Sequence, residues 1–284
     1  MKQVVTLAIP AITFLLLTAV GLGLRVEEFA RVRRTPRLLA LGLLAPLLVL
    51  PLVALALTLW FRPDPATEAG LLLIAVCPIG GISNTYSFLA RASVALSVTL
   101  TAASCLLAVA TIPLLTRVFE YLLHRPLRFD APASVLVLQL LLMLALPVGI
   151  GMAARRRWPD LADRHGPAIS RIGFAALALL VVFVIAAQFD QFVAGLRSAV
   201  PMSASFVVIA FAVGWLSATA ARAAPADRFT LAAEFATRNV AVATAIAVTV
   251  LGRVEFAVFA TTYFLTELPL MLAASAVHRA LNRR

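Results

Sequence analysis

Long apolar runs separated by short polar stretches repeat along the whole chain. Nine of these runs reach the roughly 20 residues that an α-helix needs to cross the hydrocarbon layer of a membrane. They cover residues 4–24, 38–60, 68–90, 93–117, 132–154, 167–188, 200–222, 228–251 and 254–278. The connections are short and rich in Arg, Asp and Pro. The pattern predicts an all-α membrane protein with nine transmembrane helices.

Composition agrees with this interpretation and excludes several classes of protein. The chain is 62% hydrophobic and 13% charged, which is too apolar for the interior of a soluble domain to hide. A net charge of +11 would suggest nucleic-acid binding in a soluble protein, but most of the Arg residues lie in connections between apolar runs. Both cysteines, Cys77 and Cys105, lie inside apolar runs and the three histidines form no cluster. We therefore expect neither a nucleic-acid partner nor a disulfide framework.

The positive charges divide unequally between the two sides of the predicted membrane. Seven Lys and Arg residues fall on the N-terminal side and sixteen on the other, while the last, Arg238, lies inside a predicted span. Loops on the cytoplasmic side of a membrane carry the excess of positive charge. We therefore expect a multi-pass protein of the inner (plasma) membrane, with its N-terminus outside and its C-terminus in the cytoplasm.

The third predicted span contains Pro78 and the pair Gly80 and Gly81 near its middle. Proline lacks the backbone N–H that a helix needs, and glycine disfavours a helix interior, so we expect the helix to break here. Irregular backbone at membrane depth is tolerated where it is buried in protein or lines a cavity. The break is therefore a candidate functional site.

The eighth predicted span carries two full charges, Glu234 and Arg238, followed by Asn239. This motif has no Gly or Pro, so its break is predicted from polarity alone. A charge at the bilayer centre costs at least about 2.5–3.5 kcal/mol and usually serves a function. On an intact helix, however, the i, i+4 spacing would let Glu234 and Arg238 form a buried ion pair.

The two interrupted spans occupy comparable places in the two halves of the chain. A first repeat over about residues 4–120 and a second over about 132–280 would form inverted repeats within a single transporter domain. Broken helices of such repeats cross near mid-membrane, where half-helix N-termini favour anions and freed carbonyls favour cations. The sequence thus predicts an ion-coupled secondary transporter.

Several short motifs occur together in this chain. They are Cys77-Pro78 with Gly80-Gly81, Ser83-Asn84, Leu89-Ala90-Arg91, Val94-Ala95-Leu96-Ser97, and Glu234 with Asn239. In combination they resemble the bile acid:sodium symporter family over essentially the whole chain. The resemblance implies a core of spans two, three, four, seven, eight and nine that moves against a panel of spans one, five and six. It also implies sodium-coupled transport of a small organic solute, in the first place an organic anion, by alternating access.

In that family two sodium ions bind behind the helix crossover. Carried over residue by residue, the first sodium site matches five residues with oxygen ligands: Ser83, Asn84, Ser97, Thr101 and Glu234. Ser97 and Thr101 lie on one face of the fourth span. That pair alone is also typical of ordinary Ser/Thr helix packing, but its combination with the other three favours a cation site.

The second sodium site of the family does not match. Arg238 replaces a family glutamine, and Pro46 aligns with a second one. A guanidinium has no lone pair to offer a cation. We therefore predict one bound sodium ion, with Arg238 supplying a fixed positive charge in place of the other.

Five residues near the crossover are candidates for substrate binding: Gly81, Ile82, Arg238, Asn239 and Glu267. Glu267 departs from the family, whose cavity has neutral polar residues. Glu234, Glu267, Arg238 and one sodium ion together carry no net charge, which does not favour an organic anion. Either Glu267 is protonated, or it pairs with Arg238, or the substrate is neutral or zwitterionic, or Glu267 faces a neighbouring helix without a substrate role.

Other functions remain as alternatives. A proton-coupled carrier or exporter could use Glu234 and Glu267, and related arsenite exporters use a cysteine near the first broken helix, where Cys77 lies. A sensor that binds a solute without moving it would carry the same motifs. An intramembrane enzyme is disfavoured because no histidine lies in the interior of a predicted span, away from its ends, and the only carboxylates in such positions are Glu234 and Glu267. We expect no catalytic residues and leave the oligomeric state open.

Overall fold

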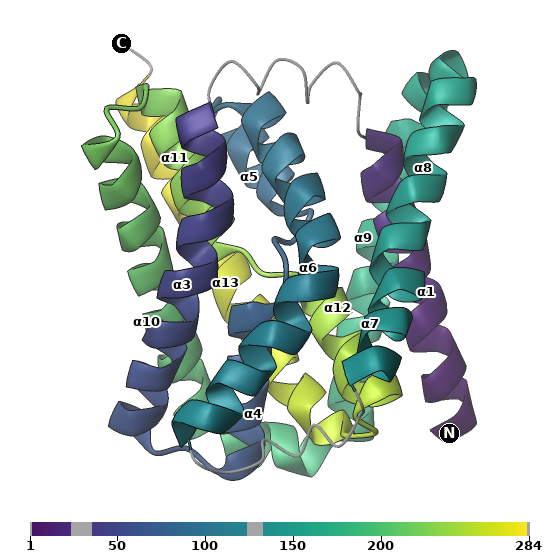
Figure 1. The fold of residues 1–284 in the computed structure, drawn as a ribbon, viewed down its shortest axis with the longest axis vertical. Helices are drawn as coiled ribbons and strands as arrows, with labels where there is room; N and C mark the ends of the chain where they lie inside the picture. The colour runs from purple at the N-terminus through teal and green to yellow at the C-terminus, as the bar shows by residue number, and fades with distance from the viewer. Residues whose placement is uncertain (1, 24–35, 124–132, 283–284) are drawn as a thin grey trace.

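The structure is a computed structural model that describes residues 2–23, 36–123 and 133–282. Within these residues the protein is a bundle of helices, and α1 begins and α13 ends at opposite ends of it (Figure 1). The elements in chain order are α1 (Lys2–Gly23), α3 (Pro36–Phe61), α4 (Pro65–Val76), α5 (Ser83–Leu89), α6 (Val94–Leu123), α7 (Ala133–Leu140), the π-helix η1 (Leu141–Ala145), α8 (Leu146–Arg157), α9 (Pro159–Ala187), α10 (Phe189–Ala220), α11 (Pro225–Ala236), α12 (Val240–Ala245), the π-helix η2 (Ile246–Val250) and α13 (Val254–Leu281).

The all-α fold with two broken helices is confirmed. Residues 77–82 separate α4 from α5, and residues 237–239 separate α11 from α12. Among the described residues, five helices are long and apolar enough to cross a membrane, or six if the two parts of α9, bent by 50°, count as one span. The halves of the broken helices are individually too short to be counted. The total of nine spans and their division into two inverted repeats stay predictions.

Two helices begin earlier than hydropathy predicts. α9 starts at Pro159 instead of residue 167, and α10 at Phe189 instead of residue 200. The first turns of these helices carry polar residues, including Asp160 and Asp190, so a search for apolar runs passes over them. Proline is favoured in a first turn because its missing N–H has no partner there in any case.

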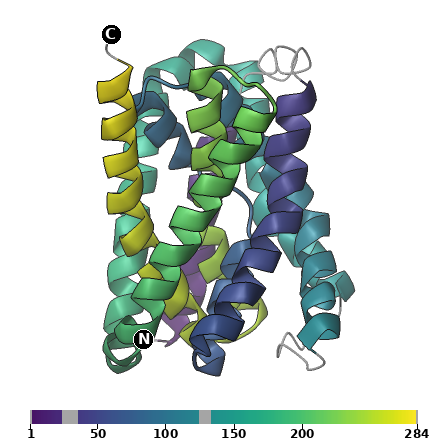
Figure 2. The same cartoon turned by 90° about the vertical axis from the view of Figure 1, so that its left-hand side faces the viewer.

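The helices form two groups, as the resemblance implied. The panel consists of α1, α7–α8 and α9, which lie on the right of Figure 1. The core consists of α3, α4–α5, α6, α10, α11–α12 and α13. Within the core, α10 lies between α3 and α13, which Figure 2 shows from the side.

Two glycines allow α1 and α8 to approach closely within the panel. A Cβ atom at Gly21 would collide with the Val148 carbonyl, and one at Gly151 would collide with the Thr18 carbonyl. Small residues at helix contacts are typical of membrane proteins, because they let van der Waals packing and weak backbone contacts form. The panel is therefore held by close backbone packing.

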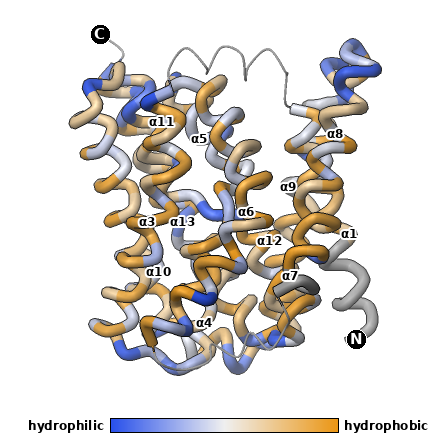
Figure 3. The backbone as a smooth tube through the Cα atoms, in the orientation of Figure 1, coloured by the Kyte–Doolittle hydropathy of each residue, from blue (hydrophilic) through white to orange (hydrophobic). Residues whose placement is uncertain are grey.

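The outer surface of the bundle is apolar at mid-height. In Figure 3 hydrophobic colours dominate the middle of the bundle, and hydrophilic ones gather towards its two ends. On α3, Leu44, Leu48 and Leu52 are more than half exposed, while Leu50 and Ala54 are buried. Exposed leucines at a spacing of four lie on one helix face, which lipid would cover. The chain is a multi-pass membrane protein.

Candidate functional site

The two breaks cross in the middle of the core as antiparallel extended segments. The N–H of Gly80 donates to the Thr237 carbonyl at 3.2 Å, and the N–H of Asn239 donates to the Pro78 carbonyl at 2.9 Å. Backbone groups released by one broken helix are thus paired with those of the other, which is what a low-dielectric environment requires. The break in the eighth predicted span forms without Gly or Pro, as its polarity predicted.

Side chains complete the crossover. A Cβ atom at Gly80 would lie 2.8 Å from the carbonyl oxygen of Arg238, so the close crossing requires a glycine. The N–H of Ile79 donates to the Ser104 hydroxyl at 3.1 Å. Asn239 caps α12, because its Oδ1 accepts a backbone N–H of that helix at 3.1 Å. The irregular backbone is therefore fixed from α6 as well as from its own segments.

The five residues predicted to bind sodium lie together. Thr101 donates from its hydroxyl to Oε2 of Glu234 at 3.3 Å and lies 3.3 Å from the Ser83 hydroxyl. The Ser97 hydroxyl is 2.5 Å from Oε1 of Glu234 and 2.8 Å from Oδ1 of Asn84. All but Asn84 are completely buried. Residues from α5, α6 and α11 thus converge on one carboxyl group.

The hydroxyls of this cluster behave differently from others on α6. Thr99 donates to the carbonyl of Ala95, four residues earlier in its own helix. Ser97 and Thr101 instead reach across to Glu234 on α11. Ser and Thr hydroxyls in membrane helices bond either to a carbonyl of their own helix or to a group on a neighbouring helix. The pair therefore contributes to the surroundings of the Glu234 carboxyl group and not to the hydrogen bonds of its own helix.

The arrangement brings together two carboxylate oxygens, one amide oxygen and three hydroxyl oxygens. Such a set of oxygens suits a hard cation. In the part of the chain that the structure describes, no group of three or more His, Cys, Asp or Glu residues could hold a metal ion.

Arg238 is almost fully buried and is held by backbone carbonyls. Its Nη1 donates to the Cys77 carbonyl at 3.3 Å and its Nη2 to the Glu234 carbonyl. Because α11 ends at Ala236, the i, i+4 geometry of an intact helix is lost. No ion pair joins Glu234 and Arg238 among the described residues, so the alternative of a simple buried ion pair is wrong.

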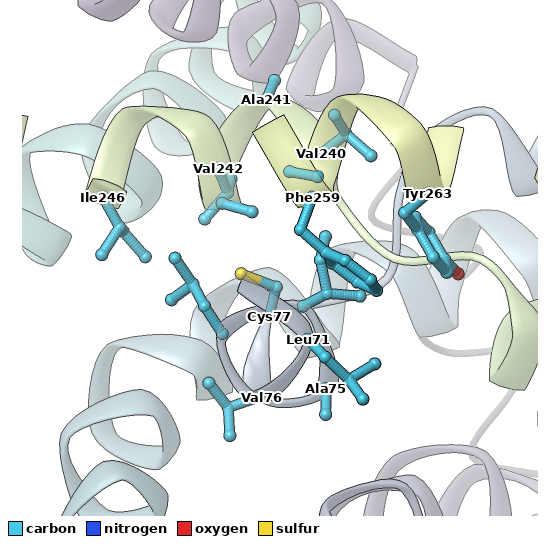
Figure 4. Packing of buried hydrophobic residues seen from close by; sticks show 14 of the residues in the cluster. Leu71, Ala75, Val76, Cys77, Val240, Ala241, Val242, Ile246, Phe259 and Tyr263 are labelled. Atoms are coloured by element: carbon cyan, nitrogen blue, oxygen red, sulfur yellow. The ribbon is translucent and has the colours of Figure 1, made fainter. Parts of the chain in front are cut away.

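Cys77, at the start of the first break, lies in an apolar environment. Figure 4 shows it among side chains of α4, α12 and α13, including Leu71, Val242 and Phe259. Its thiol is free and buried. Cys77 is therefore a packing residue in this structure.

A cavity of about 220 Å³ lies between the crossover and the panel. Four of the five residues predicted to bind substrate line it, namely Gly81, Ile82, Arg238 and Asn239. Its panel side is formed by small and apolar residues of α1 and α9. The cavity therefore has one apolar wall and one wall with amide side chains and backbone groups.

Glu267, the fifth candidate, does not line this cavity. It is 1% exposed, and its Oε1 accepts a hydrogen bond from the Thr237 hydroxyl at 3.1 Å. It forms no ion pair with Arg238 among the described residues. Of the explanations offered for Glu267, pairing with Arg238 is therefore wrong in this structure.

Sequence reasoning missed two residues of the site. Ser104 accepts the Ile79 N–H, and its spacing from Ser97 and Thr101 places it on the same face of α6, which was a usable signal. Thr237 lies inside the eighth-span motif and contacts Glu267. Its partner is 30 residues away, so no local pattern could have revealed the contact.

Comparison with known proteins identifies the family. A model described as the Sodium Bile acid symporter family matches residues 10–195. The chain belongs to this family. It is a family of transporters, so the chain is not expected to be an enzyme. The resemblance drawn from the motifs around the two breaks is confirmed.

Named relatives agree with the family. The chain is 30% identical over 210 residues to the probable sodium/metabolite cotransporter BASS2, chloroplastic, of Oryza sativa subsp. japonica, covering 71% of this chain and 47% of the relative. It is 30% identical over 240 residues to the sodium/bile acid cotransporter 4 of Homo sapiens (82% and 54%), and 30% identical over 173 residues to the uncharacterized sodium-dependent transporter YocS of Bacillus subtilis (59% and 52%). The chain spans about half the length of these relatives.

Proposed function

We propose that this protein is a sodium-coupled symporter of a small organic anion that works by alternating access. The observation that carries the proposal is the buried oxygen cluster around Glu234, built from both broken helices and α6. The names of the relatives, which include sodium-dependent transporters, support the same coupling ion.

The cation would bind between Ser83, Asn84, Ser97, Thr101 and Glu234. In the structure Glu234 and the hydroxyls hydrogen-bond to one another, and a sodium ion would replace those bonds with oxygen ligation. Asn84 belongs to the cluster and also lines the cavity between the crossover and the panel. Through Asn84, sodium occupancy would order the cavity wall against which the substrate binds.

The substrate would occupy the cavity between crossover and panel. Apolar side chains such as Leu16, Val20 and Leu177 suit a hydrocarbon part, and the amides of Asn84 and Asn239 suit a polar head group. Movement of the panel against the core would then expose the cavity alternately to the two sides. We propose the inner membrane as its location, with the N-terminus outside and an excess of positive charge in the cytoplasm.

We further propose that only one sodium ion is coupled. The guanidinium of Arg238 donates to the Cys77 and Glu234 carbonyls, and backbone carbonyls of this kind would otherwise be free to ligate a second cation. Arg238 would thus act as a fixed positive charge at that position.

Thermal unfolding of the purified protein in sodium and in choline buffer tests the cation site. A ligand that binds only the folded state raises its stability by mass action, so sodium should raise the melting temperature, and a screen of small carboxylates should raise it further only in sodium. Uptake of the best carboxylate into proteoliposomes, with and without a sodium gradient, separates a symporter from a solute sensor. Equal melting temperatures in sodium and choline would contradict the proposal.

A proton-coupled carrier is the second candidate, and the position of Glu267 favours it. This carboxyl is buried with a hydroxyl donor and no cationic partner among the described residues. A buried carboxylate without a counter-charge is costly, and binding a proton removes the charge without needing space for an ion. Uptake driven by a pH gradient in sodium-free buffer, and lost in Glu267→Gln, would favour this candidate over sodium symport.

A further inference from the structure

A second, smaller cavity is bounded by α3, the first break and α6, whereas the panel helices bound the large one. Its volume is about 20 Å³. A cavity needs at least roughly 10–15 Å³ to hold one water molecule, so this one has room for a single water molecule or monatomic ion. Arg238, Ser104 and Thr111 contribute its polar lining.

Two polar groups among these residues are buried without a hydrogen-bond partner. They are Nε of Arg238 and the hydroxyl of Thr111. Ser104 is different, because its hydroxyl accepts the Ile79 N–H and donates to the Thr101 carbonyl. Buried donors without acceptors are rare in native proteins and costly, above all on a charged group. An acceptor in the small cavity would satisfy both groups.

The guanidinium of Arg238 forms no salt bridge in the part of the chain that the structure describes. Its two Nη atoms donate to backbone carbonyls. The Glu234 carboxyl faces Ser97 and Thr101. The Glu267 carboxyl faces Thr237, the neighbour of Arg238 in the extended break, and neighbouring side chains of an extended segment point to opposite sides. The buried guanidinium is thus without a carboxylate in direct contact, and an anion beside it would be stabilised.

We propose that the small cavity binds one halide ion, chloride under physiological conditions, between Arg238 and Thr111. A monatomic anion can accept a hydrogen bond from both groups and neutralise the guanidinium, which a water molecule cannot do. The rest of the lining is mostly apolar, including Leu43, Pro46 and Leu47. Such a wall strengthens the attraction between the ion and Arg238 by lowering the local dielectric constant. The site goes beyond sodium-coupled transport and does not depend on the identity of the substrate.

Thermal unfolding with chloride as the probe tests the site. Sodium concentration is held constant while chloride is replaced by gluconate, which is too large for the cavity. Chloride should raise the melting temperature of the wild-type protein saturably, by about 5–10 °C at a concentration of about one hundred times Kd, and bromide should do the same. Thr111→Val should lose most of this shift, and Thr111→Ser, which keeps the hydroxyl, should retain it.

The control is Thr116→Val on the same helix, because the Thr116 hydroxyl donates to its own helix at Ile112 and Pro113 and does not line the cavity. It should keep the full chloride shift. Equal melting temperatures in chloride and gluconate, or an undiminished shift in Thr111→Val, would overturn the halide site. Sodium gluconate compared with choline gluconate tests the sodium site separately, so that failure of one proposal is distinguished from failure of the other.

Discussion

Glu234 and Arg238 lie four residues apart on the same broken helix, yet their surroundings differ in kind. Glu234 accepts hydrogen bonds from hydroxyls of α6, in a cluster where every polar side chain has a partner. Arg238 donates to two carbonyls and keeps one donor unpaired beside a small cavity. In our proposal the oxygens around Glu234 bind a mobile cation. At the position of Arg238 the guanidinium of the side chain is itself the cation.

This difference suggests how a transporter can change the number of ions coupled to transport without changing its fold. The crossover depends on backbone hydrogen bonds at Gly80 and Asn239, and neither bond requires a particular side chain at position 238. An arginine there can therefore stand in the place of a mobile ion while the broken helices keep their geometry. In our proposal the side chain of Arg238 takes the place of one coupled ion.

The largest expected effect comes from removing the negative charge of Glu234. Glu234→Gln keeps the shape of the side chain but not its charge, so sodium should no longer stabilise the protein. At a concentration of about a thousand times Kd the loss would be about 4 kcal/mol, measured as the difference in unfolding free energy between sodium and choline. Glu255→Gln, at the partly exposed start of α13, is the matched control and should respond like the wild-type protein. A full sodium effect in Glu234→Gln would remove Glu234 from the site.

Arg238→Gln tests the proposal that the guanidinium of Arg238 takes the place of a second sodium ion. It removes two guanidinium hydrogen bonds, which should cost about 3 kcal/mol of stability without ions, since bonds to charged groups contribute roughly 1.5–3 kcal/mol each. The freed carbonyls and the new amide oxygen should admit a second sodium ion, and the Hill coefficient for sodium should rise above one. Arg253→Gln, whose side chain is partly exposed, should change neither quantity. An unchanged Hill coefficient together with unchanged sodium affinity would contradict the proposal that Arg238 replaces a second sodium ion.

The first broken helix was predictable in position because Pro78 and Gly80 are incompatible with a helix interior. The second was predictable only because Glu234 and Arg238 are costly in a membrane. The partners of Arg238 were not predictable, because they are the carbonyls of Cys77 and Glu234 and no residue type marks an acceptor carbonyl. The starts of α9 and α10 were not predictable from hydropathy, because their first turns are polar. Hydropathy detects segments that contact lipid and does not detect helices as such.

The sodium candidates were predicted as a set only through the family resemblance. Spacing alone placed Ser97 and Thr101 on one face of α6, but their partner Glu234 is 133 to 137 residues away. Glu267 shows the opposite limit. Its place inside an apolar run marked it as a candidate, but only the fold reveals that it faces Thr237 and not the cavity.

The close crossing of the two breaks can be tested at Gly80. In Gly80→Ala the new methyl group would press on the Arg238 carbonyl, and overpacking of this kind typically costs about 1–3 kcal/mol. We expect a loss of about 2 kcal/mol in unfolding free energy and weaker sodium stabilisation, because the two breaks would be forced apart. Gly149→Ala on α8, where a Cβ atom would meet nothing within 4 Å, should leave stability unchanged or slightly raised. Tolerance of alanine at both positions would show that the crossing is looser than the structure implies.

The smallest effect separates two threonines of one helix. Thr101→Val removes a hydroxyl that reaches Glu234, whereas Thr99→Val removes one that bonds only to the carbonyl of Ala95 in its own helix. Valine keeps the shape of threonine, so packing is conserved in both variants. Losing one neutral oxygen ligand should lower sodium affinity about tenfold in Thr101→Val, which corresponds to about 1.4 kcal/mol, and should leave it unchanged in Thr99→Val. The sodium affinity of each variant is measured from its melting temperature at increasing sodium concentrations. An equal loss in the two variants would mean that the hydroxyls matter to the helix and not to the ion, and the oxygen cluster would then be a structural network like many others in membrane proteins.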